Sequence, residues 1–463
     1  MNDSVFHQGP LHAVVLAAGR GQRMAGTLPK VLQPLAGQPL VAHVVATLQA
    51  QQPHDLVVVA GLHREAIAAI LPAETRIVIQ PEPRGTGDAA RVGLDGLENS
   101  GIALVALADV PLVTVQSHRQ VVQAAAGGAL ALLTTTPPEP TGYGRIVRDA
   151  RGEVQAIVEE RVADARQKCI AEIFVGGLAA PTERLKDWLG RLEPRQHQQE
   201  EYFLTDVVAL ARHDGVAVVA VAISPEEACG INDLTQLAHA ERIMQRRIAQ
   251  SLMQRGVRLA DPARLDVRGQ VTIGRNVVLD VGVVLEGEVH LEDDVRIGPY
   301  AVIRDSTIGA GSTILPFSHV EGAVLHQGVR VGPMARLRPG SRLHDGVRVG
   351  NFVEIKAATL HNRVQANHLS YLGDAEVGAA TNIGAGTITC NYDGHAKHRT
   401  VIGEGVFVGS GTELVAPVSL GDASTIAAGS TVTHDVPAES LCVARTRQRL
   451  IPGWARRTMR RKG

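Results

Sequence analysis

The C-terminal half of the chain places a branched apolar residue at every sixth position. These positions form three runs: Ile273, Leu279, Leu285, Leu291, Ile297 and Ile303; Val331, Leu337, Leu343, Val349 and Ile355; Ile402, Val408, Leu414, Leu420, Ile426 and Val432. Neither the period of a helix nor that of a simple strand gives this spacing. A hexapeptide β-helix does, because each repeat supplies one flat strand with one inward residue and one tight turn. The pattern therefore predicts a parallel β-helix after residue 262.

The repeat lapses at residues 384–400, GAGTITCNYDGHAKHRT. Polar insertions in a solenoid leave the coil as loops, so we expect this segment to contribute to a site. After the last repeat, residues 445–463 carry eight Arg or Lys and no acidic residue. Such a basic tail is consistent either with disorder or with phosphate binding.

The N-terminal half alternates short apolar runs with segments of helix length. Six runs are typical of buried strands: residues 12–18, 55–61, 75–80, 103–109, 130–135 and 216–223. This alternation predicts an α/β Rossmann-like domain whose parallel sheet is covered on both faces. Ligands on such sheets bind at the carboxyl ends of the strands, which here are polar or rich in glycine.

A helix is predicted between the two halves. Residues 233–256 carry apolar side chains at helical spacing, including Ala240, Ile248 and Leu252. Asp233 can cap the amino end of this helix, and Gly256 can terminate it. We expect it to link two separate domains.

The overall composition narrows the class of protein. The chain has 48 glycines but only 2 Trp, 5 Tyr and 6 Phe, which favours a repetitive architecture with many turns. A net charge of −1 argues against a nucleic-acid or membrane-surface binder. The four cysteines are scattered, and the first residues resemble no signal peptide. We expect a cytoplasmic protein without structural disulfides.

The motif LAAGRGQRM at residues 16–24, followed by LPKVL at 28–32, is the first that indicates a chemistry. A glycine-rich turn after a strand offers backbone N–H groups to phosphate, and Arg23 and Lys30 add positive charge. The third glycine of a dinucleotide fingerprint is absent, because Met24 takes its place. The motif instead resembles the signature of the sugar-nucleotide pyrophosphorylases.

Further motifs strengthen this resemblance: GTGDA (85–89), TGYGRI (141–146), IVEE (157–160), YFLTD (202–206) and GIN (230–232). Together with the hexapeptide half, nearly the whole chain resembles one family. In that family a UDP-N-acetylglucosamine pyrophosphorylase is fused to a glucosamine-1-phosphate N-acetyltransferase. The resemblance implies a nucleotidyltransferase domain over 1–232, a linker helix over 233–256, a left-handed β-helix acetyltransferase domain over 257–446 and a basic tail over 447–463.

The resemblance also implies the residues of a uridylyltransferase site. Those that would bind UTP or the UDP-sugar are Leu16, Ala17, Ala18, Gly19, Arg23, Lys30, Gln80, Gly85 and Thr86. Gly144 and Glu159 would contact the amino sugar, while Asp109 and Asn232 would bind Mg²⁺. Carboxylate and amide oxygens suit that ion, and the transfer of a uridylyl group depends on alignment and charge neutralisation.

Two positions depart from the family pattern in this half. Leu107 and Ala108 precede Asp109, where the family has a small or aromatic residue and then glycine. Phe174, within EIFVGG, stands where the family has an asparagine that reaches the sugar. A phenyl ring cannot supply that hydrogen bond. We therefore expect uridylyl transfer to be weakened or directed toward another hexose phosphate.

The motifs RLRPGS (336–341), VGNFVEIK (349–356), NHLSYLGD (367–374) and NIGAGTITCNYDG (382–394) resemble the acetyltransferase half. They imply His368 as the catalytic base, because an amine must lose a proton as it attacks a thioester. Glucosamine-1-phosphate would be bound by Arg338, Lys356, Tyr371 and Asn382. Acetyl-CoA would be bound by Ala385, Asn391, Tyr392, Ser410, Ala428 and Arg445.

The expected reactants are glucosamine-1-phosphate, acetyl-CoA, UTP and N-acetylglucosamine-1-phosphate, with Mg²⁺ as cofactor. The resemblance implies a homotrimer with acetyltransferase sites between subunits. It also implies that the product is a precursor of peptidoglycan and lipopolysaccharide. One alternative is a hexose-1-phosphate nucleotidyltransferase with a purely structural β-helix, and another is a regulatory subunit with a decayed nucleotide site. Cys390 is a further candidate, as an acyl-carrying nucleophile, although only His395 and His398 lie near it in the sequence.

Overall fold

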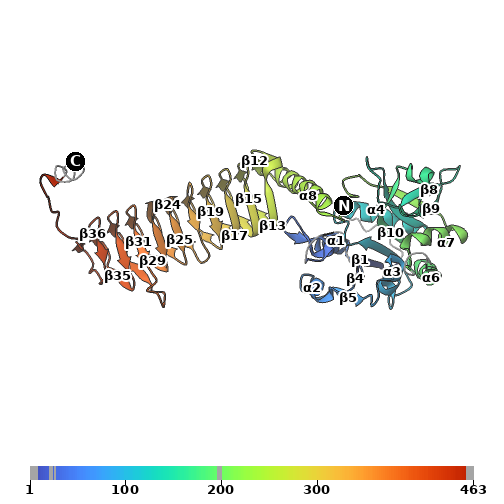
Figure 1. Ribbon diagram of the computed structural model, residues 1–463, viewed down its shortest axis with the longest axis horizontal. Helices are drawn as coiled ribbons and strands as arrows, with labels where there is room; N and C mark the ends of the chain where they lie inside the picture. Colours follow the sequence, from blue (N-terminus) through green and yellow to red (C-terminus); the bar gives the residue numbers. More distant parts are fainter. Residues whose placement is uncertain (1–8, 20–23, 25–27, 195–200, 455–463) are drawn as a thin grey trace, which may run out of the picture. The chain divides into compact units, whose positions relative to one another are not determined.

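The computed structural model describes residues 9–19, 24, 28–194 and 201–454. The chain divides into two compact units, Met1–Met244 and Gln245–Gly463 (Figure 1). Buried apolar clusters lie within each unit. None of the helices described has the length and the apolar composition that crossing a bilayer requires.

A nine-stranded sheet forms the middle of the first unit, with the main order β11-β7-β10-β6-β1-β4-β5. The bounds of these strands are β1 Leu11–Ala17, β4 Asp55–Ala60, β5 Arg76–Ile79, β6 Ile102–Leu107, β7 Leu130–Thr135, β10 Ile173–Pro181 and β11 Val218–Ala222. All six predicted strands are confirmed and run in one direction. The prediction of an entirely parallel sheet is wrong, because β10 pairs antiparallel with both β6 and β7.

Helices cover both faces of this sheet. Successive residues of a strand point to opposite faces. Accordingly, Val15 packs in the cluster that holds α1 and α4, and Val14 packs in the cluster that holds α3, α6 and α7. The helices are α1 Leu40–Gln49, α2 Arg64–Ala68, α3 Thr86–Leu94, α4 Val115–Ala126, α5 Ala165–Lys168, α6 Thr182–Gly190 and α7 Val207–His213.

Trp188, on α6, is buried in the cluster beneath α3 and α7. Its indole N–H donates a hydrogen bond of 2.9 Å to Oδ2 of Asp214, just after α7. Burial of the large ring and a satisfied polar atom together fix α6 against α7.

Shorter elements complete the first unit. The hairpin of β8 (Arg145–Arg148) and β9 (Val154–Val158) joins the sheet through β10. Strands β2 (Pro34–Leu35) and β3 (Gln38–Pro39) form a separate ribbon. Single helical turns are η1 Lys30–Leu32 and η2 Leu204–Asp206.

The predicted linker helix is α8, Leu234–Gln254. Asp233 caps it, since its Oδ1 accepts a hydrogen bond of 2.8 Å from the backbone N–H of Gln236. Gly256 ends the helical segment with φ of +90°, a conformation that favours glycine. The division between the two units falls within this helix, after Met244.

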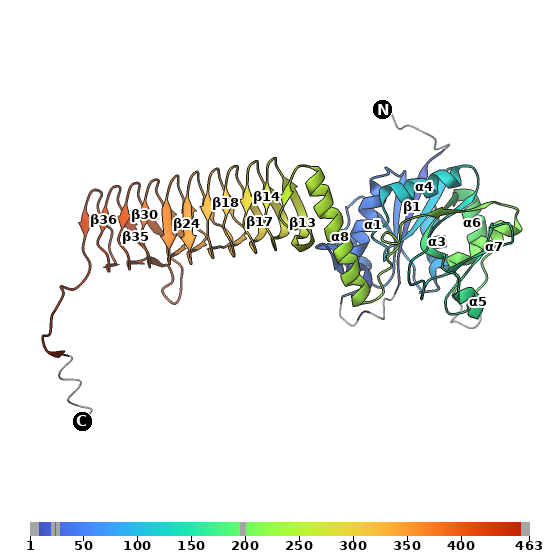
Figure 2. The same ribbon diagram turned by 90° about the horizontal axis from the view of Figure 1, so that it is seen from above.

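The second unit is a parallel β-helix, and Figure 2 shows its coils stacked side by side. An eleven-stranded sheet forms one face: β12 Arg258–Leu259, β14 Val278–Leu279, β16 Arg296–Ile297, β18 Thr313–Ile314, β21 Arg330–Val331, β24 Arg348–Asn351, β27 Gln365–His368, β30 Asn382–Ile383, β33 Phe407–Val408, β36 Thr425–Ile426 and β38 Leu441–Cys442. The remaining strands form a sixteen-stranded sheet. After its long strands this sheet divides into two branches, which begin at β19 and β20.

The long strands of the sixteen-stranded sheet are β13 Asp266–Ile273, β15 Val284–Leu291 and β17 Val302–Ile308. One branch holds β20 Val324–Leu325, β23 Arg342–Leu343, β26 Thr359–Leu360, β29 Ala375–Val377, β32 Thr400–Ile402 and β35 Val418–Leu420. The other holds β19 His319–Glu321, β22 Arg336–Leu337, β25 Glu354–Lys356, β28 Tyr371–Gly373, β31 Ile388–Cys390, β34 Glu413–Val415 and β37 Thr431–Val432. A last turn, η3, spans Pro262–Arg264.

The predicted inward positions are confirmed. Each of the residues in the three runs is at most 8% exposed, and all belong to one cluster. The predicted gap at 384–400 is too long, however, because β31 continues the coil within it. Thr389 occupies the inward position there and is buried, with its hydroxyl donating to the carbonyl oxygen of Gly373 at 3.1 Å. The chain leaves the coil only from Asn391, and it returns at β32.

Candidate active sites

A cavity of about 590 Å³ opens at the carboxyl ends of β1 and β6. It is lined by Leu16, Ala17, Ala18, Gly19, Lys30, Val31, Gln80, Pro83, Gly85, Thr86, Ala89, Leu107, Asp109, Arg161, Glu201 and Asn232. All the residues predicted to bind the nucleotide line this cavity, apart from Arg23, which lies outside the described residues. The predicted crevice at this edge of the sheet therefore exists.

Gly85 forms the turn that leads from the cavity into α3. Its φ is +97°, and a Cβ atom there would lie 2.4 Å from the carbonyl oxygen of Tyr202. Only glycine fits so close to a neighbouring backbone. Thr86 begins α3, and its Oγ1 accepts a hydrogen bond of 3.1 Å from the backbone N–H of Leu204. The helix N-terminus thus lies in the wall of the cavity.

Gln80 is buried with a defined amide orientation. Its Nε2 donates to the carbonyl oxygen of Gly85 at 3.1 Å and to Oδ2 of Asp88 at 2.9 Å. A carbonyl and a carboxylate only accept, so both amide hydrogens are used. The Oε1 atom therefore remains as the acceptor that Gln80 offers to a ligand.

Lys30, Asp109 and Asn232 come together although they are far apart in the sequence. The Lys30 ammonium donates to Oδ2 of Asp109 at 2.5 Å and to Oδ1 of Asn232 at 2.7 Å. The backbone N–H of Ile231 also donates to the carbonyl oxygen of Asp109 at 2.9 Å, which holds the loop of Asn232 against the end of β6.

The two predicted metal ligands suit Mg²⁺. Asp109 and Asn232 direct one carboxylate and one amide oxygen toward a single cation, the Lys30 ammonium. Mg²⁺ in proteins takes few protein oxygens of this kind and completes its octahedron with water and phosphate. The donor set therefore fits the ion that the sequence predicted.

A second cavity of about 370 Å³ adjoins the first, with which it shares Thr86, Asp109 and Asn232. Gly144 and Glu159 line it, as the prediction for an amino-sugar pocket requires. Oε1 of Glu159 accepts a hydrogen bond of 3.0 Å from the hydroxyl of Thr205.

Gly144 also has a steric role in this pocket. A Cβ atom at Gly144 would lie 2.8 Å from Cγ2 of Ile157, so the approach of these strands requires glycine.

The departures from the family pattern lie in this second cavity. Phe174 lines it and is 8% exposed, with its backbone N–H donating to the carbonyl oxygen of Gly144 at 2.8 Å. Leu107 lines both cavities and packs against Gly176, where a Cβ atom would lie 2.3 Å from Cδ1 of Leu107. Ala108 is buried beneath the site. An apolar ring and an apolar branch thus line the cavity that is predicted to hold the sugar.

Several lining residues were not assigned a role from the sequence. Tyr143 and Thr205 belong to the quoted motifs TGYGRI and YFLTD, while Arg161 and Glu201 lie just outside IVEE and YFLTD. The hydroxyl of Tyr143 accepts a hydrogen bond of 3.1 Å from the backbone N–H of Gly230. Their position within or next to the recognised motifs is the sequence feature that could have identified them.

In the second unit, His368 lies at the end of β27, beside Asn351 of the preceding coil. Its Nδ1 is 2.9 Å from Oδ1 of Asn351. Since an amide oxygen only accepts, Nδ1 carries the proton and Nε2 presents a lone pair. The imidazole is exposed, so Nε2 can reach an external proton donor.

Positive side chains gather on neighbouring coils. Nη1 of Arg338 donates to Oε1 of Glu354 at 2.9 Å, and Nζ of Lys356 is 3.7 Å from Oδ2 of Asp374. A further cation that was not predicted, Lys397, lies in the loop that leaves the coil. Its pKa is lowered by the neighbouring ammonium of Lys356, so these two cations face one another.

Tyr371 lies in the same branch as these cations, paired with Glu354 on the previous coil and Ile388 on the next. Asn391 is buried, and its Nδ2 donates to Oδ2 of Asp374. Asn382 is placed differently: it lies on β30 of the eleven-stranded face, between Gln365 and Phe407.

Three of the residues predicted for acetyl-CoA, Ala385, Ser410 and Ala428, lie on successive turns of one row. The carbonyl oxygen of Ala385 accepts from the N–H of Gly411, and that of Ser410 accepts from the N–H of Gly429, at 2.8 and 2.9 Å. Nη1 of Arg445 then donates to the carbonyl oxygen of Ala428 at 2.7 Å. Tyr392 is exposed on the adjacent loop and donates to the carbonyl oxygen of Gly394.

Cys390 is poorly suited to act as a nucleophile. Burial, with a smaller effect from Glu413, raises the pKa of its thiol. The thiolate, which is the reactive form, is therefore disfavoured.

Comparison with known proteins shows the family to which the chain belongs. Residues 13–180 match the MobA-like NTP transferase domain, and residues 270–305 and 399–434 match the bacterial transferase hexapeptide (six repeats). The Bifunctional protein GlmU of Stutzerimonas stutzeri is 52% identical, over 97% of this chain and 99% of that protein. Those of Aromatoleum aromaticum and Pseudomonas entomophila are 48% and 51% identical, over 98% and 96% of this chain and 100% and 98% of theirs. The chain therefore belongs to the family of bifunctional GlmU proteins.

Proposed function

We propose that this protein makes UDP-N-acetylglucosamine in two steps. The second unit transfers an acetyl group from acetyl-CoA to glucosamine-1-phosphate. The first unit then transfers a uridylyl group from UTP to N-acetylglucosamine-1-phosphate and releases pyrophosphate. The observation that carries the proposal is that one chain holds both the Lys30–Asp109–Asn232 cluster and, in its β-helix, an exposed histidine oriented by Asn351 together with the cations Arg338 and Lys356.

In the uridylyl transfer, a phosphate oxygen of the sugar attacks the α-phosphorus of UTP. The bond from that phosphorus to the bridging oxygen breaks, and pyrophosphate leaves with the electron pair. This reaction depends on holding three charged groups in line. Gln80 Oε1 can accept from the uracil N–H, the Gly19 turn and the start of α3 can hold phosphate, and Lys30 neutralises charge.

Asp109 and Asn232 would hold Mg²⁺, which supplies charge neutralisation at the phosphates. Glu159 and the backbone near Gly144 would bind the N-acetylated sugar in the second cavity. Phe174 reduces the polarity of that pocket, so the sugar loses one hydrogen bond there. The cavity's other polar groups keep the site competent.

In the acetyl transfer, the amine of glucosamine-1-phosphate attacks the thioester carbonyl of acetyl-CoA. Nε2 of His368 takes the proton from the amine, and the coenzyme A thiolate leaves. Asn351 fixes the tautomer of His368 that this role requires. Arg338, Lys356 and Tyr371 would bind the phosphorylated sugar, with Asn382 as a further ligand, while Ala385, Asn391, Tyr392, Ser410, Ala428 and Arg445 would bind acetyl-CoA.

We also propose a homotrimer with the acetyltransferase site between subunits. One row of left-handed turn residues exposes large apolar side chains, Tyr300, Phe317, Met334, Phe352 and Leu369. The rings of Tyr300 and Phe317 stack with their centroids 5.5 Å apart. A continuous apolar row of this kind marks an interface, and Leu369 directly follows His368.

The product would enter the synthesis of peptidoglycan and lipopolysaccharide. UTP and acetyl-CoA are cytoplasmic metabolites, so both reactions would take place in the cytoplasm. A purely structural β-helix is disfavoured because it needs neither the His368–Asn351 pair nor the clustered cations. A regulatory subunit is disfavoured because Lys30, Asp109 and Asn232 retain an organised site.

The test is to incubate the purified full chain with glucosamine-1-phosphate, acetyl-CoA, UTP and Mg²⁺ and to identify the products by mass. We expect UDP-N-acetylglucosamine, pyrophosphate and free coenzyme A. Without acetyl-CoA, no UDP-N-acetylglucosamine should form, unless N-acetylglucosamine-1-phosphate is supplied. A chain that makes a UDP-hexose but never consumes acetyl-CoA would refute the proposal for the second unit.

A further inference from the structure

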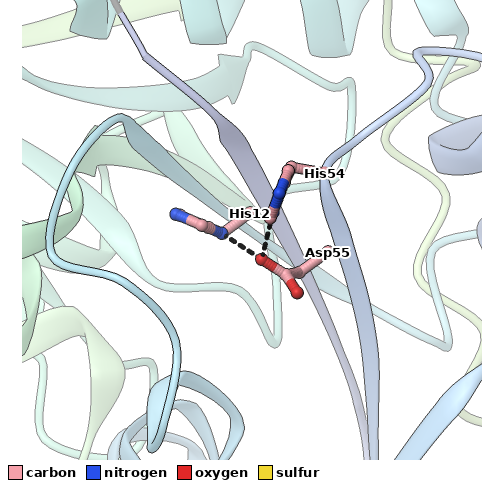
Figure 3. A group of neighbouring side chains, drawn as sticks. All are labelled: His12, His54 and Asp55. Atoms are coloured by element: carbon pink, nitrogen blue, oxygen red, sulfur yellow. Dashed lines mark hydrogen bonds and ion pairs between the residues drawn. The ribbon is translucent and has the colours of Figure 1, made fainter.

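A second group of side chains that can bind a metal lies at the amino ends of β1 and β4, in the sheet of the first unit. His12 is on β1, His54 directly precedes β4, and Asp55 is the first residue of β4 (Figure 3). His12 and Asp55 are register partners at the amino ends of these parallel strands. The nucleotide cavity lies at the carboxyl ends of the sheet, around Leu16 and Leu107. This group therefore belongs to neither proposed reaction.

The imidazoles of His12 and His54 both contact one carboxylate oxygen of Asp55. Oδ2 of Asp55 lies 2.7 Å from Nδ1 of His12 and 2.9 Å from Nδ1 of His54. His12 is 0% exposed, whereas the His54 side chain is 60% exposed. The two imidazole rings meet edge to face, with their centroids 6.0 Å apart. One ligand is thus held in the interior, and another is free to adjust at the surface.

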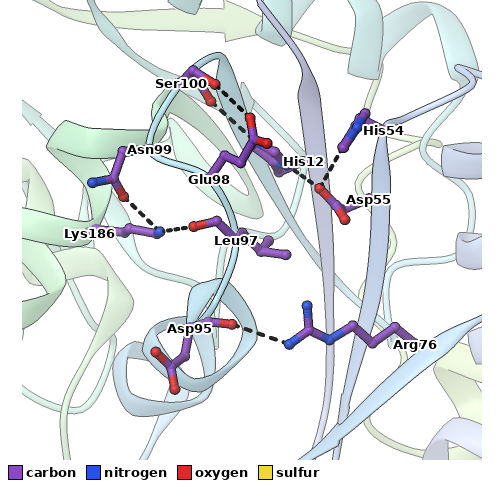
Figure 4. Close-up of polar contacts among 10 residues, drawn as sticks. All are labelled: His12, His54, Asp55, Arg76, Asp95, Leu97, Glu98, Asn99, Ser100 and Lys186. Carbon is purple, nitrogen blue, oxygen red and sulfur yellow. Dashed lines mark hydrogen bonds and ion pairs between the residues drawn. The ribbon is translucent and has the colours of Figure 1, made fainter.

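The second ring nitrogen of His12 fixes its tautomer. Nε2 of His12 lies 3.1 Å from the carbonyl oxygen of Ser100 (Figure 4). A carbonyl only accepts, so Nε2 carries a hydrogen. In the neutral imidazole, Nδ1 then presents a lone pair toward a carboxylate oxygen that also only accepts. A positive centre between these atoms, either a second proton or a metal ion, is needed to make the contact favourable.

The segment that carries the Ser100 carbonyl is itself held in place. In the preceding segment, Lys186 donates to the carbonyl oxygen of Leu97 and to Oδ1 of Asn99, the latter at 2.8 Å. The Ser100 hydroxyl donates to Glu98 at 3.2 Å. A histidine that ligates a metal through one nitrogen usually donates its other N–H to a fixed backbone carbonyl. His12 has this second contact already in place.

We propose that Nδ1 of His12, Nδ1 of His54 and Oδ2 of Asp55 bind a divalent transition-metal ion of the Zn²⁺ class. Two imidazoles and a carboxylate are a common three-residue ligand set for zinc, with water in the fourth position. Mg²⁺ is a poor fit, because it prefers oxygen ligands. The ion would tie the amino ends of β1 and β4 to each other, and the contact of His12 with Ser100 links them to the segment before β6.

The geometry requires only a small adjustment. Tetrahedral zinc with bonds of about 2.0–2.1 Å holds its ligand atoms about 3.3 Å apart. The present separations from Asp55 are 2.7 and 2.9 Å, so the ligands must spread by roughly half an ångström. His54 can move outward because its side chain is exposed, while buried His12 keeps its place.

The test is a titration of the metal-free, untagged full chain with Zn²⁺, and with Co²⁺ as a spectroscopic probe. We expect a site that binds Zn²⁺ in the micromolar range and gives the visible absorption of tetrahedral Co²⁺. His54→Ala should weaken this binding at least about tenfold, because it removes one ligand from an exposed position. The matched control is His63→Ala, an exposed histidine of the same unit that should leave the site unchanged.

Two further measurements keep the test decisive. Zn²⁺ should raise the melting temperature of the wild type and of His63→Ala, but not that of His54→Ala or Asp55→Asn. Asp109→Ala should retain the site, which separates it from the proposed magnesium ligands. Equal Zn²⁺ affinity and equal Co²⁺ spectra in the wild type and His54→Ala would overturn the proposal. Binding of neither probe at 100 μM, roughly a hundredfold above the expected range, would show that a proton alone joins these groups.

Discussion

The ammonium group of Lys30 lies 2.5 Å from Oδ2 of Asp109, an oxygen that we assign to the divalent cation. The same ammonium also donates a hydrogen bond to Oδ1 of Asn232. A positive charge thus neutralises Asp109 and occupies the amide oxygen of Asn232. In the proposed reaction, Lys30 would exchange these contacts for the phosphates.

Replacement of Lys30 by Met should therefore tighten the binding of Mn²⁺, a probe for Mg²⁺, in the absence of nucleotide. Removing one like charge at about 4 Å is worth at least about 1 kcal/mol, the value in bulk water, so we expect at least a roughly fivefold gain in affinity. Uridylyl transfer should fall, because the phosphates lose a cation. Calorimetric titration of Mn²⁺ checks the first effect, with Lys30→Arg as the control that keeps the charge. Weaker Mn²⁺ binding by Lys30→Met would contradict this account.

The two activities should be separable by single changes. His368→Ala removes the general base, which contributes about a hundredfold to ten-thousandfold, and should leave uridylyl transfer from N-acetylglucosamine-1-phosphate intact. Asp109→Ala should impair uridylyl transfer and spare acetylation. Both rates are measured with each variant. Loss of both activities in either folded variant would mean that the sites are not independent.

Phe174→Asn should raise kcat/KM for N-acetylglucosamine-1-phosphate by about two- to tenfold, which corresponds to one neutral hydrogen bond of roughly 0.5–1.5 kcal/mol. Acetylation should not change. The buried ring also packs in the core, so we expect a lower melting temperature. If the wild type prefers glucose-1-phosphate, Phe174 selects a different sugar. An unchanged kcat/KM would show that a neighbour such as Thr205 already makes the contact.

His118 should make the first unit sensitive to acid. Burial lowers the pKa of this histidine from its ordinary value of 6.5 to about 4, although Glu227 opposes the shift. Between these values the unfolded chain binds a proton that the folded chain does not, so stability falls as the pH falls. From pH 7 to pH 5 the wild type should lose about 2 kcal/mol more than His118→Gln. Urea denaturation followed by circular dichroism tests this, and parallel pH profiles would contradict it.

Removal of the chain from Arg445 onward should raise KM for acetyl-CoA. Arg445 is anchored to the Ala428 carbonyl at the end of the row of turns, where a phosphate group can reach it. The effect should shrink as salt increases, because exposed charges are screened. Steady-state kinetics at two ionic strengths measure it, and a KM that does not change would remove Arg445 from the site.

The β-helix was predictable, because its buried positions recur at a fixed period and are occupied by branched apolar residues. Strand β10 was not among the six predicted strands, and its direction does not follow from the apolar run Ile173–Pro181, which has the same composition whether it pairs parallel or antiparallel. The coil at Thr389 was missed because a buried threonine replaced the branched apolar residue and satisfied its hydroxyl on Gly373.

The candidate sites were predictable as motifs, but their contacts were not. Lys30 and Asn232 meet across 202 positions of the sequence. His12 meets Asp55 only through the register of β1 and β4. Neither contact follows from local spacing, because each depends on how distant strands and loops are brought together.

The burial of Trp188 determines what fluorescence can report about this chain. The sequence has 2 tryptophans, Trp188 in the first unit and Trp454, which is already exposed. The coils contain none, so loss of the β-helix leaves tryptophan emission nearly unchanged, whereas loss of the contact with Asp214 shifts it to longer wavelength. Tryptophan emission therefore reports the unfolding of the first unit alone and does not detect the unfolding of the second unit.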